Sequence, residues 1–158
     1  MILNLFLMIT FDTLAAFRAH IGQSLGSSDW VTITQEMVND FAKATGDNQW
    51  IHVNTELAKL SPFKTTIAHG FLTLSLAPKF MYEMYQVQSV KMGLNYGTNK
   101  VRFTSPVPTG SRIRMHAILK EVEDQQPNGV KSVIEATFEL EGGAKPACVA
   151  ELITLMFE

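Results

Sequence analysis

Residues 70–84 read Gly-Phe-Leu-Thr-Leu-Ser-Leu-Ala-Pro-Lys-Phe-Met-Tyr-Glu-Met, the most apolar stretch of helical character in the chain. Apolar side chains would lie on nearly every face of a helix built from this stretch. The pattern therefore predicts a helix of about residues 70–85 that is buried all round. Pro78 has no backbone N–H, so it removes the hydrogen bond to Leu74 and should bend the helix. The rest of the chain has to cover this helix.

The chain after the helix alternates between apolar and polar residues, which is typical of strands with one buried face. Residues 92–96 and 100–103 are expected to form two short strands or one strand interrupted by Gly97, and a turn-rich segment fills residues 105–110. Three longer alternating runs follow, over residues 112–117, 130–140 and 148–156. They predict an antiparallel meander. The inferred fold class is α+β, with a long curved antiparallel sheet wrapped around the central helix.

Two helices are expected before residue 47. The first begins at Asp12 or Thr13 and ends near Gly22, and the second is capped by Thr34 and stops at Gly46, a residue able to take a left-handed conformation. The first helix is expected to run through Leu14, Phe17 and Ile21, and the buried stripe of the second is expected to consist of Met37, Phe41 and Ala44.

Composition favours one compact domain over residues 1–158, because 46% of the 158 residues are hydrophobic and only 18% are charged. The formal net charge of −2 and the scattered Lys and Arg residues give no basic stripe, which argues against a nucleic-acid partner. The single cysteine, Cys148, cannot form an internal disulfide and is interpreted as a small buried thiol. A reducing, cytoplasmic location fits this cysteine content.

The first residues are apolar but lack a basic flank and a cleavage site, and the stretch is too short to span a bilayer. We therefore expect neither a signal peptide nor a membrane anchor. Residues 1–11 form either an arm that packs on the domain or on a partner chain, or the product of a mis-assigned start, with Met8 as the alternative start.

Candidate chemistry lies between residues 45 and 71. Asp47 follows a predicted helix end and His52 comes five residues later, so that a carboxylate and an imidazole could hold one water between them and exchange protons with it. Such a pair needs partial burial, which brings the two pKa values toward neutrality. The spacing alone is weak evidence, because an Asp after a helix can simply brace its loop and a lone His is more often structural.

Gly70 adds an independent signal, because a free backbone N–H at the start of a buried helix can form half of an oxyanion hole. Close packing that only a glycine permits explains Gly70 equally well. His69 is expected to cap or buttress the turn. A metal site of His52, Glu56 and His69 is disfavoured, and no metal or cofactor is expected. The sequence has no Gly-x-Ser-x-Gly elbow, phosphate loop or dinucleotide fingerprint.

Three segments together resemble a known family. They are Ala-Thr-Gly-Asp-Asn-Gln-Trp-Ile-His (44–52), Thr-Ile-Ala-His-Gly-Phe-Leu-Thr-Leu-Ser-Leu (66–76) and Asn-Tyr-Gly-Thr-Asn-Lys-Val-Arg-Phe (95–103). The sequence is similar to the MaoC-like, (R)-specific enoyl-CoA hydratase/dehydratase family, in the branch that includes nodulation protein N. The resemblance implies a hot-dog fold, a homodimer or a dimer of dimers in which two sheets join into one, and active sites near the subunit interface.

The resemblance implies hydration of a trans-2-enoyl-CoA to an (R)-3-hydroxyacyl-CoA, or the reverse dehydration. In that reaction Asp47 and His52 activate water and the Gly70 amide polarises the thioester carbonyl. Many family members have Asn and Pro where this chain has Gln49 and Trp50, and a serine that some members place on the central helix would fall at Pro78. The substrate, bound as a CoA or an acyl-carrier thioester, is expected to contact Gln49, Trp50, His69, Phe71, Leu74, Tyr96, Asn99 and Arg102.

Two other functions stay open on the sequence. A thioesterase of the same fold usually relies on a carboxylate from the central helix, whereas residues 71–82 contain none and Glu83 comes too late. A non-catalytic protein that binds acyl thioesters would need neither Asp47 nor His52.

Overall fold

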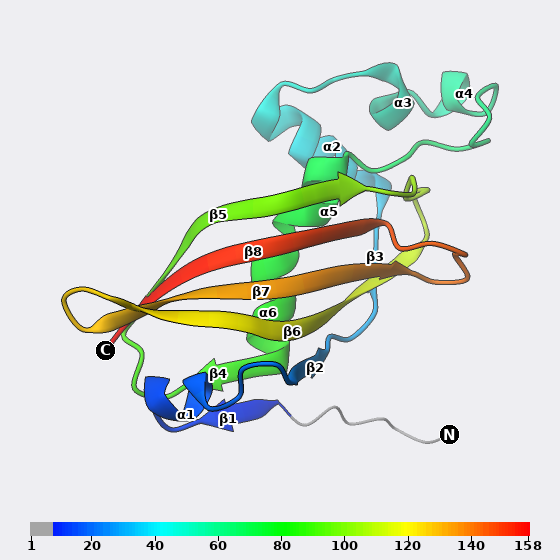
Figure 1. Ribbon diagram of the computed structural model, residues 1–158. Coiled ribbons are helices and arrows are strands. Elements are labelled where there is room, and N and C mark those ends of the chain that lie inside the picture. Colours follow the sequence, from blue (N-terminus) through cyan, green and yellow to red (C-terminus); the bar gives the residue numbers. More distant parts are fainter. Residues whose placement is uncertain (1–7) are drawn as a thin grey trace.

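The computed structural model describes residues 8–158, and Figure 1 shows how their helices and strands are arranged. In chain order the elements are β1 (Ile9–Phe11), α1 (Leu14–Arg18), β2 (Ser24–Ser27), β3 (Val31–Thr32), α2 (Gln35–Thr45), α3 (Trp50–Val53), α4 (Thr55–Ala58), α5 (Gly70–Ser75), α6 (Ala77–Met84), β4 (Tyr85–Val87), β5 (Met92–Phe103), β6 (Arg112–Gln125), β7 (Gly129–Leu140) and β8 (Cys148–Phe157).

Six strands form one antiparallel sheet in the order β2-β6-β7-β8-β5, with β3 also paired to β6. The four long strands β5 to β8 lie side by side and curve across α5 and α6 (Figure 1). Every second residue of β8, from Cys148 to Met156, is buried, as the alternation predicts. β5 is one strand whose register shifts between Asn95 and Gly97. The expectation of a single strand interrupted by Gly97 is therefore confirmed, and that of two short strands is not. The α+β class and the sheet around a helix are therefore confirmed.

The central helix is divided into α5 and α6, with Leu76 between them. Pro78 lies in the first turn of α6, where its missing N–H leaves no helical hydrogen bond unmade. The predicted disturbance of the helix at Pro78 is therefore present, and it takes the form of an interruption at Leu76, two residues ahead of the proline.

The prediction that this helix is buried all round is wrong. Its inner side packs on the sheet, where the Phe80 ring lies 6.1 Å from the Phe138 ring and both side chains are fully buried. Phe71 and Tyr82 are 66% and 79% exposed on the other side. A single sheet covers only one side of a helix, so the apolar residues of the opposite side remain uncovered in the part of the chain that the structure describes.

The N-terminal segment packs on the end of the central helix. β1 pairs in parallel with β4, which follows α6, and Phe11 is buried. The described part of the expected arm therefore lies on its own chain, whereas residues 1–7 are outside the described residues. Thr13 caps α1 as expected. The helix ends at Arg18, however, so the expected helix through Ile21 to near Gly22 is too long. Ile21 is 43% exposed.

α2 is held at both ends by the residues that the sequence indicates. The Thr34 side chain accepts a hydrogen bond from the Met37 N–H at 3.2 Å, and Gly46 ends the helix in the left-handed region at φ 80°. Its buried face is rotated by one position from the predicted stripe, because Ala44 is exposed and the fully buried residues are Val38 and Ala42.

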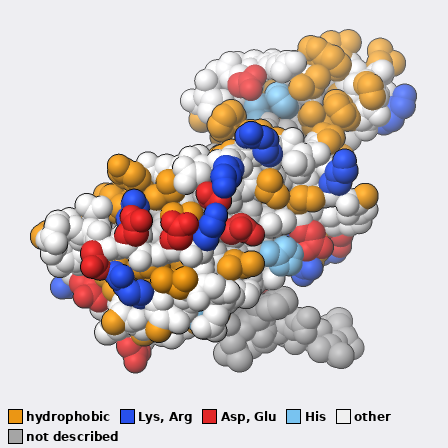
Figure 2. All heavy atoms as spheres, in the orientation of Figure 1, with side chains coloured by type: hydrophobic (Ala, Val, Ile, Leu, Met, Phe, Trp, Pro, Cys, Tyr) orange, Lys and Arg blue, Asp and Glu red, His pale blue; other side chains and the backbone are white. Residues whose placement is uncertain are grey.

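α3, α4 and the turn that follows them form an overhang that extends beyond the free edge of β5 (Figure 1). Figure 2 shows hydrophobic side chains gathered on this overhang, and the exposed ones include Leu57, Leu60 and Phe63. Over residues 8–158, no helix has the length and apolar character needed to cross a membrane.

Candidate active site

The left-handed turn at Gly46 places Asp47 directly after α2. The Asp47 Oδ1 accepts a hydrogen bond from the Gln49 N–H at 3.4 Å, a local contact that braces the loop. Asp47 is exposed in the single chain. Partial burial of the pair was expected, and for this member it is not found.

His52 lies on α3 and is only 6% exposed. Its Nδ1 lies 2.7 Å from the carbonyl oxygen of Ile67. A carbonyl oxygen only accepts hydrogen bonds, so Nδ1 carries the proton and Nε2 of the neutral ring presents a lone pair. The Gln35 amide donates to the His52 carbonyl at 2.8 Å and ties α3 to α2. His52, the buried member of the predicted pair, is thus held in the tautomer whose Nε2 can accept a proton.

His69 joins the pair from the residue that precedes α5. Its ring stacks on His52 with the centroids 3.8 Å apart and the planes 25° apart. Its Nε2 donates to the Asp47 carbonyl oxygen at 2.9 Å, so Nδ1 is the unprotonated nitrogen of the neutral ring. Nδ1 is buried and has no hydrogen-bond partner among the described residues. The role of buttress expected for His69 agrees with these contacts, which connect it to both Asp47 and His52.

A carboxylate oxygen of Asp47 and one ring nitrogen each of His52 and His69 all lie within 4.8 Å of one another. Glu56, by contrast, pairs with Lys59. A metal ion bound about 2.1 Å from one imidazole lies in the plane of that ring. It would therefore lie well outside the plane of the second, stacked ring. The arrangement suits two neutral imidazoles and one water better than a shared metal ion, and the expectation of a metal-free site stays a prediction.

Gly70 is the first residue of α5, and its backbone N–H has no acceptor recorded among residues 8–158. A Cβ at this position would lie 2.8 Å from atoms of the Phe103 ring. Close packing against Phe103 therefore requires a glycine here. The close packing that the sequence offered as an explanation of Gly70 is therefore present. It is compatible with a free N–H, and the role of this N–H as an oxyanion donor stays a prediction.

Two small hollows meet at these residues, and both are lined by His52 and Gly70. The first, of about 210 Å³, is also lined by Asp47, His69 and Phe71. The second, of about 240 Å³, runs toward the loop after β5. The remaining residues that line the two hollows, which sequence reasoning did not single out for the site, are Phe41, Thr45, Ile67, Ala68, Thr73, Phe103, Ser105, Pro106, Val107 and Ala147. Only their position in the folded chain identifies them.

The structure brings five of the predicted site residues together, namely Asp47, His52, His69, Gly70 and Phe71. The other predicted contacts lie outside both hollows. Leu74 is half-buried on α5, and the exposed remainder comprises Gln49, Trp50, Tyr96, Asn99 and Arg102. Tyr96, Asn99 and Arg102 share strand β5, whose outer edge is unpaired among residues 8–158.

A comparison with known protein families identifies the family to which the chain belongs. A family model described as a MaoC like domain matches residues 16–139. The chain belongs to the MaoC-like dehydratase family. The resemblance seen in the three sequence segments is thereby confirmed, and this MaoC-like protein is an enzyme of the hydro-lyase class.

Individual relatives agree with this assignment. The MaoC-like protein is 56% identical over 146 residues to 3-hydroxyacyl-thioester dehydratase Z of Mycobacterium tuberculosis, covering 92% of this chain and 97% of that protein. It is 44% identical over 146 residues to nodulation protein N of Rhizobium leguminosarum bv. viciae, covering 91% of each. The solved (R)-hydratase PhaJ1 from Pseudomonas aeruginosa superposes with a TM-score of 0.67 at 22% identity, covering 87% of this chain and 82% of that one. This likeness confirms the expected hot-dog fold.

Proposed function

We propose that the protein adds water to trans-2-enoyl thioesters to give (R)-3-hydroxyacyl thioesters, or catalyses the reverse dehydration. The observation that carries this proposal is the convergence of Asp47, His52 and the Gly70 N–H on one site. Its relatives include a protein named as a 3-hydroxyacyl-thioester dehydratase, which acts on the same class of compound. We propose that the thioester is carried either by CoA or by an acyl carrier protein.

In the proposed reaction a water lies between the Asp47 carboxylate and Nε2 of His52. The lone pair on Nε2 accepts a proton from this water while the water oxygen forms a bond to C3 of the enoyl group. The π electrons of the C2–C3 bond move toward C1, and negative charge collects on the thioester oxygen. A proton returned by the Asp47–His52 pair to C2 completes the addition, so the protein ends unchanged.

The Gly70 N–H is proposed to donate to the thioester oxygen as this charge develops. One such preorganised donor contributes about 3 kcal/mol to transition-state stabilisation. A carbonyl held at Gly70 would lie where the two hollows meet, so the acyl group and the pantetheine arm could extend in different directions.

We further propose that the protein works as a homodimer or a dimer of dimers, with the free edge of β5 paired to a second copy. Leu94 and Tyr96 on this strand are 47% and 66% exposed, and the overhang and the outer side of the central helix are also apolar and uncovered. A second copy would bury these surfaces and shield Asp47 from water, which a proton-transfer pair requires.

The test follows the loss of the enone absorbance of crotonyl-CoA, which is consumed by hydration. We expect turnover by the native protein and a loss of at least a hundredfold in kcat for both Asp47→Asn and His52→Ala. Undiminished turnover in both variants would remove the proposed pair.

Mass detection of the products separates the two other functions. A thioesterase would release free thiol, and a binding protein would leave the thioester unchanged. Glu83, the acidic residue of α6, is paired with Lys79 four residues away and lies far along the helix from Gly70, which favours the hydratase.

A further inference from the structure

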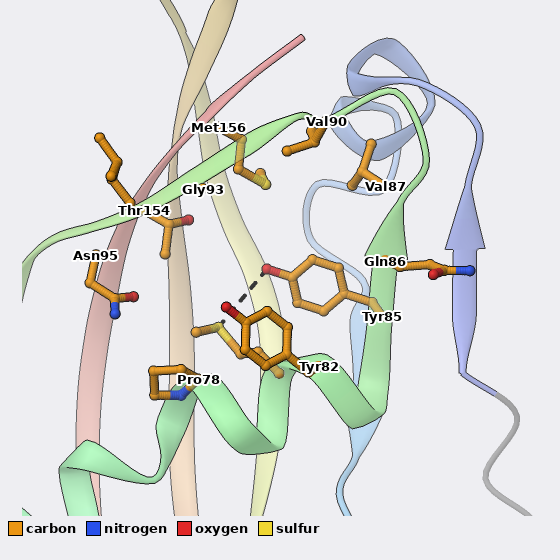
Figure 3. A pocket seen from close by; sticks show the side chains of 12 residues that line it. Pro78, Tyr82, Tyr85, Gln86, Val87, Val90, Gly93, Asn95, Thr154 and Met156 are labelled. Carbon is orange, nitrogen blue, oxygen red and sulfur yellow. Dashed lines mark hydrogen bonds between the residues drawn. The ribbon is translucent and has the colours of Figure 1, made fainter.

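A separate cavity of about 270 Å³ lies at the far end of the central helix (Figure 3). It is partly open to solvent, because Tyr82 on its wall is 79% exposed, and it is bounded by α6, β4, the beginning of β5 and the end of β8. The residues that line it are Pro78, Met81, Tyr82, Tyr85, Gln86, Val87, Val90, Gly93, Leu94, Asn95, Thr154 and Met156. The proposed hydration uses none of them.

This cavity lies on the same side of the helix as the site. Gly70, Leu74 and Pro78 follow one another at intervals of four residues, and this spacing keeps them on one side. The eight helical steps from Gly70 to Pro78 correspond to about 12 Å along the helix. An extended chain covers roughly 1.2 Å per bond. An acyl chain whose thioester is held at Gly70 and which follows the helix therefore reaches the cavity after about ten bonds.

The wall of this cavity carries polar groups with unused hydrogen-bonding capacity. The Tyr85 hydroxyl points into it, and its one recorded partner is the Met81 sulfur at 3.9 Å, a weak acceptor (Figure 3). Burial raises the pKa of this hydroxyl, which therefore stays protonated as a donor. The Tyr82 hydroxyl points into the same space, and the Asn95 amide faces it from the opposite wall (Figure 3). Thr154 lies beside Asn95, but its hydroxyl is already hydrogen-bonded to the Ser132 hydroxyl at 2.7 Å. A purely hydrocarbon ligand would satisfy none of Tyr85, Tyr82 and Asn95.

We infer that the cavity receives the far end of the acyl chain and selects chains that carry a hydroxyl group near that end. This inference rests on the proposed hydratase function and adds a substrate class to it: long-chain enoyl thioesters hydroxylated at or near the terminal carbon. The Tyr85 hydroxyl and the Asn95 amide are the groups that bind the substrate hydroxyl, because each can donate and accept a hydrogen bond.

Gly93 allows a direct test of whether the chain enters the cavity. Gly93 pairs with Met156, whose side chain is buried, so a side chain at position 93 would point to the same face of the sheet. A Cβ there meets no atom within 4 Å, and the variant should fold. The measured quantity is the ratio of kcat/KM for trans-2-dodecenoyl-CoA to kcat/KM for crotonyl-CoA. We expect this ratio to be at least tenfold lower in Gly93→Val than in the native protein. An unchanged ratio overturns the inference.

Tyr85→Phe tests the selection of the hydroxyl group. The variant keeps the ring, which stacks on Phe17 at 5.4 Å, so the packing of the cavity wall is retained. The measured quantity is the preference for 12-hydroxy-trans-2-dodecenoyl-CoA over trans-2-dodecenoyl-CoA, as a ratio of kcat/KM values. We expect the native protein to prefer the hydroxylated chain and Tyr85→Phe to reduce this preference about five- to tenfold. An equal preference in both proteins overturns the selection.

Crotonyl-CoA distinguishes these failures from failure of the proposed function. Its chain is too short to reach Pro78. If the native protein does not hydrate crotonyl-CoA or either longer substrate, the hydratase proposal itself fails. If it hydrates crotonyl-CoA while the ratios above do not change, only the inference about the cavity fails.

Discussion

At the scale of single residues, the site is organised by two histidines with different tasks. His52 and His69 each give one N–H to a backbone carbonyl, of Ile67 and Asp47 respectively. These two hydrogen bonds fix both ring orientations and both neutral tautomers. His69 thus acts through Asp47 and His52, and we assign it a positioning role.

Two substitutions of His69 separate its two contacts. His69→Phe keeps an aromatic ring against His52 but loses the donor to the Asp47 carbonyl, whereas His69→Gln keeps a donor and loses the ring. We expect kcat on crotonyl-CoA to fall ten- to a hundredfold in each, because small displacements of catalytic groups have effects of this size. Thermal unfolding serves as the control for folding. Native kcat in both variants would contradict the positioning role.

Gly70→Ala tests the close approach to Phe103. The added Cβ forces the ring to move, and overpacking of this kind costs about 1–3 kcal/mol in the free energy of unfolding. The double variant Gly70→Ala with Phe103→Leu should recover most of this stability in urea unfolding. If kcat recovers in parallel, the glycine serves to pack the helix start and to keep the N–H in place. Failure of the double variant to regain stability would show that the contact is not the cause.

Cys148 is a fully buried thiol, as its place in an alternating strand predicts. Burial raises its pKa to about 11 from the ordinary 9.0. The thiolate is the reactive form, so we expect no reaction with Ellman's reagent at pH 8 until the protein is unfolded. A folded-state pKa above the unfolded value also means that the free energy of unfolding decreases as the pH rises through the interval between these two values. Rapid labelling of the folded protein would contradict the burial.

At the scale of elements, the positions of the proposed catalytic groups depend on where helices end. α2 stops at a left-handed glycine and delivers Asp47, and α5 begins at the residue that offers a free N–H. The break at Leu76 divides the central helix without moving either end away from the sheet. Helix termini thus position Asp47 and the Gly70 N–H, and the central helix packs on the sheet.

Gly46→Ala should separate catalysis from stability, with Gly22→Ala as a matched control. The two glycines have φ values of 80° and 83°, and in neither case would a Cβ meet an atom within 4 Å. Each substitution should therefore cost about 1 kcal/mol in the free energy of unfolding, from backbone strain alone. We expect only Gly46→Ala to lower kcat markedly, because it moves Asp47. Equal kcat values in both variants would contradict the proposed role of this turn.

At the scale of the whole molecule, three surfaces are apolar and uncovered. They are the first half of the edge strand β5, the overhang of α3 and α4 (Figure 2), and the outer side of the central helix. Elsewhere, opposite charges are interspersed over the outer face of the sheet, with pairs such as Lys120–Glu151 and Lys131–Glu123. This contrast supports the proposal that a second copy covers the apolar surfaces.

Charges on β5 should therefore disrupt the proposed dimer. The double variant Leu94→Asp with Tyr96→Asp loses little internal packing, because both side chains are about half exposed or more. We expect the native protein to sediment as a dimer or larger assembly and the double variant as a monomer with low activity. Ile21→Asp, at an exposed position in the turn after α1, is the control and should not change the assembly. A native monomer would refute the proposed role of the β5 edge.

The sequence by itself determined the periodic features of this protein. The alternation in β6, β7 and β8, the apolar helix with its break near Pro78, the caps of α2 and the likeness to the family are all properties of neighbouring residues. Asp47, His52 and Gly70 could also be selected, because they lie in short segments with recognisable chemistry. Local spacing and backbone preference are sufficient for such features.

Tertiary structure decided what depends on packing between distant segments. The stacking of His69 on His52, the Phe103 ring against Gly70 and the pairing of β1 with β4 join residues that no local pattern connects. The helix of residues 70–84 is the clearest case. Its composition predicted complete burial, but composition states only how apolar a segment is. Which side is covered depends on the single sheet beside it, and Phe71 and Tyr82 remain exposed on the other side.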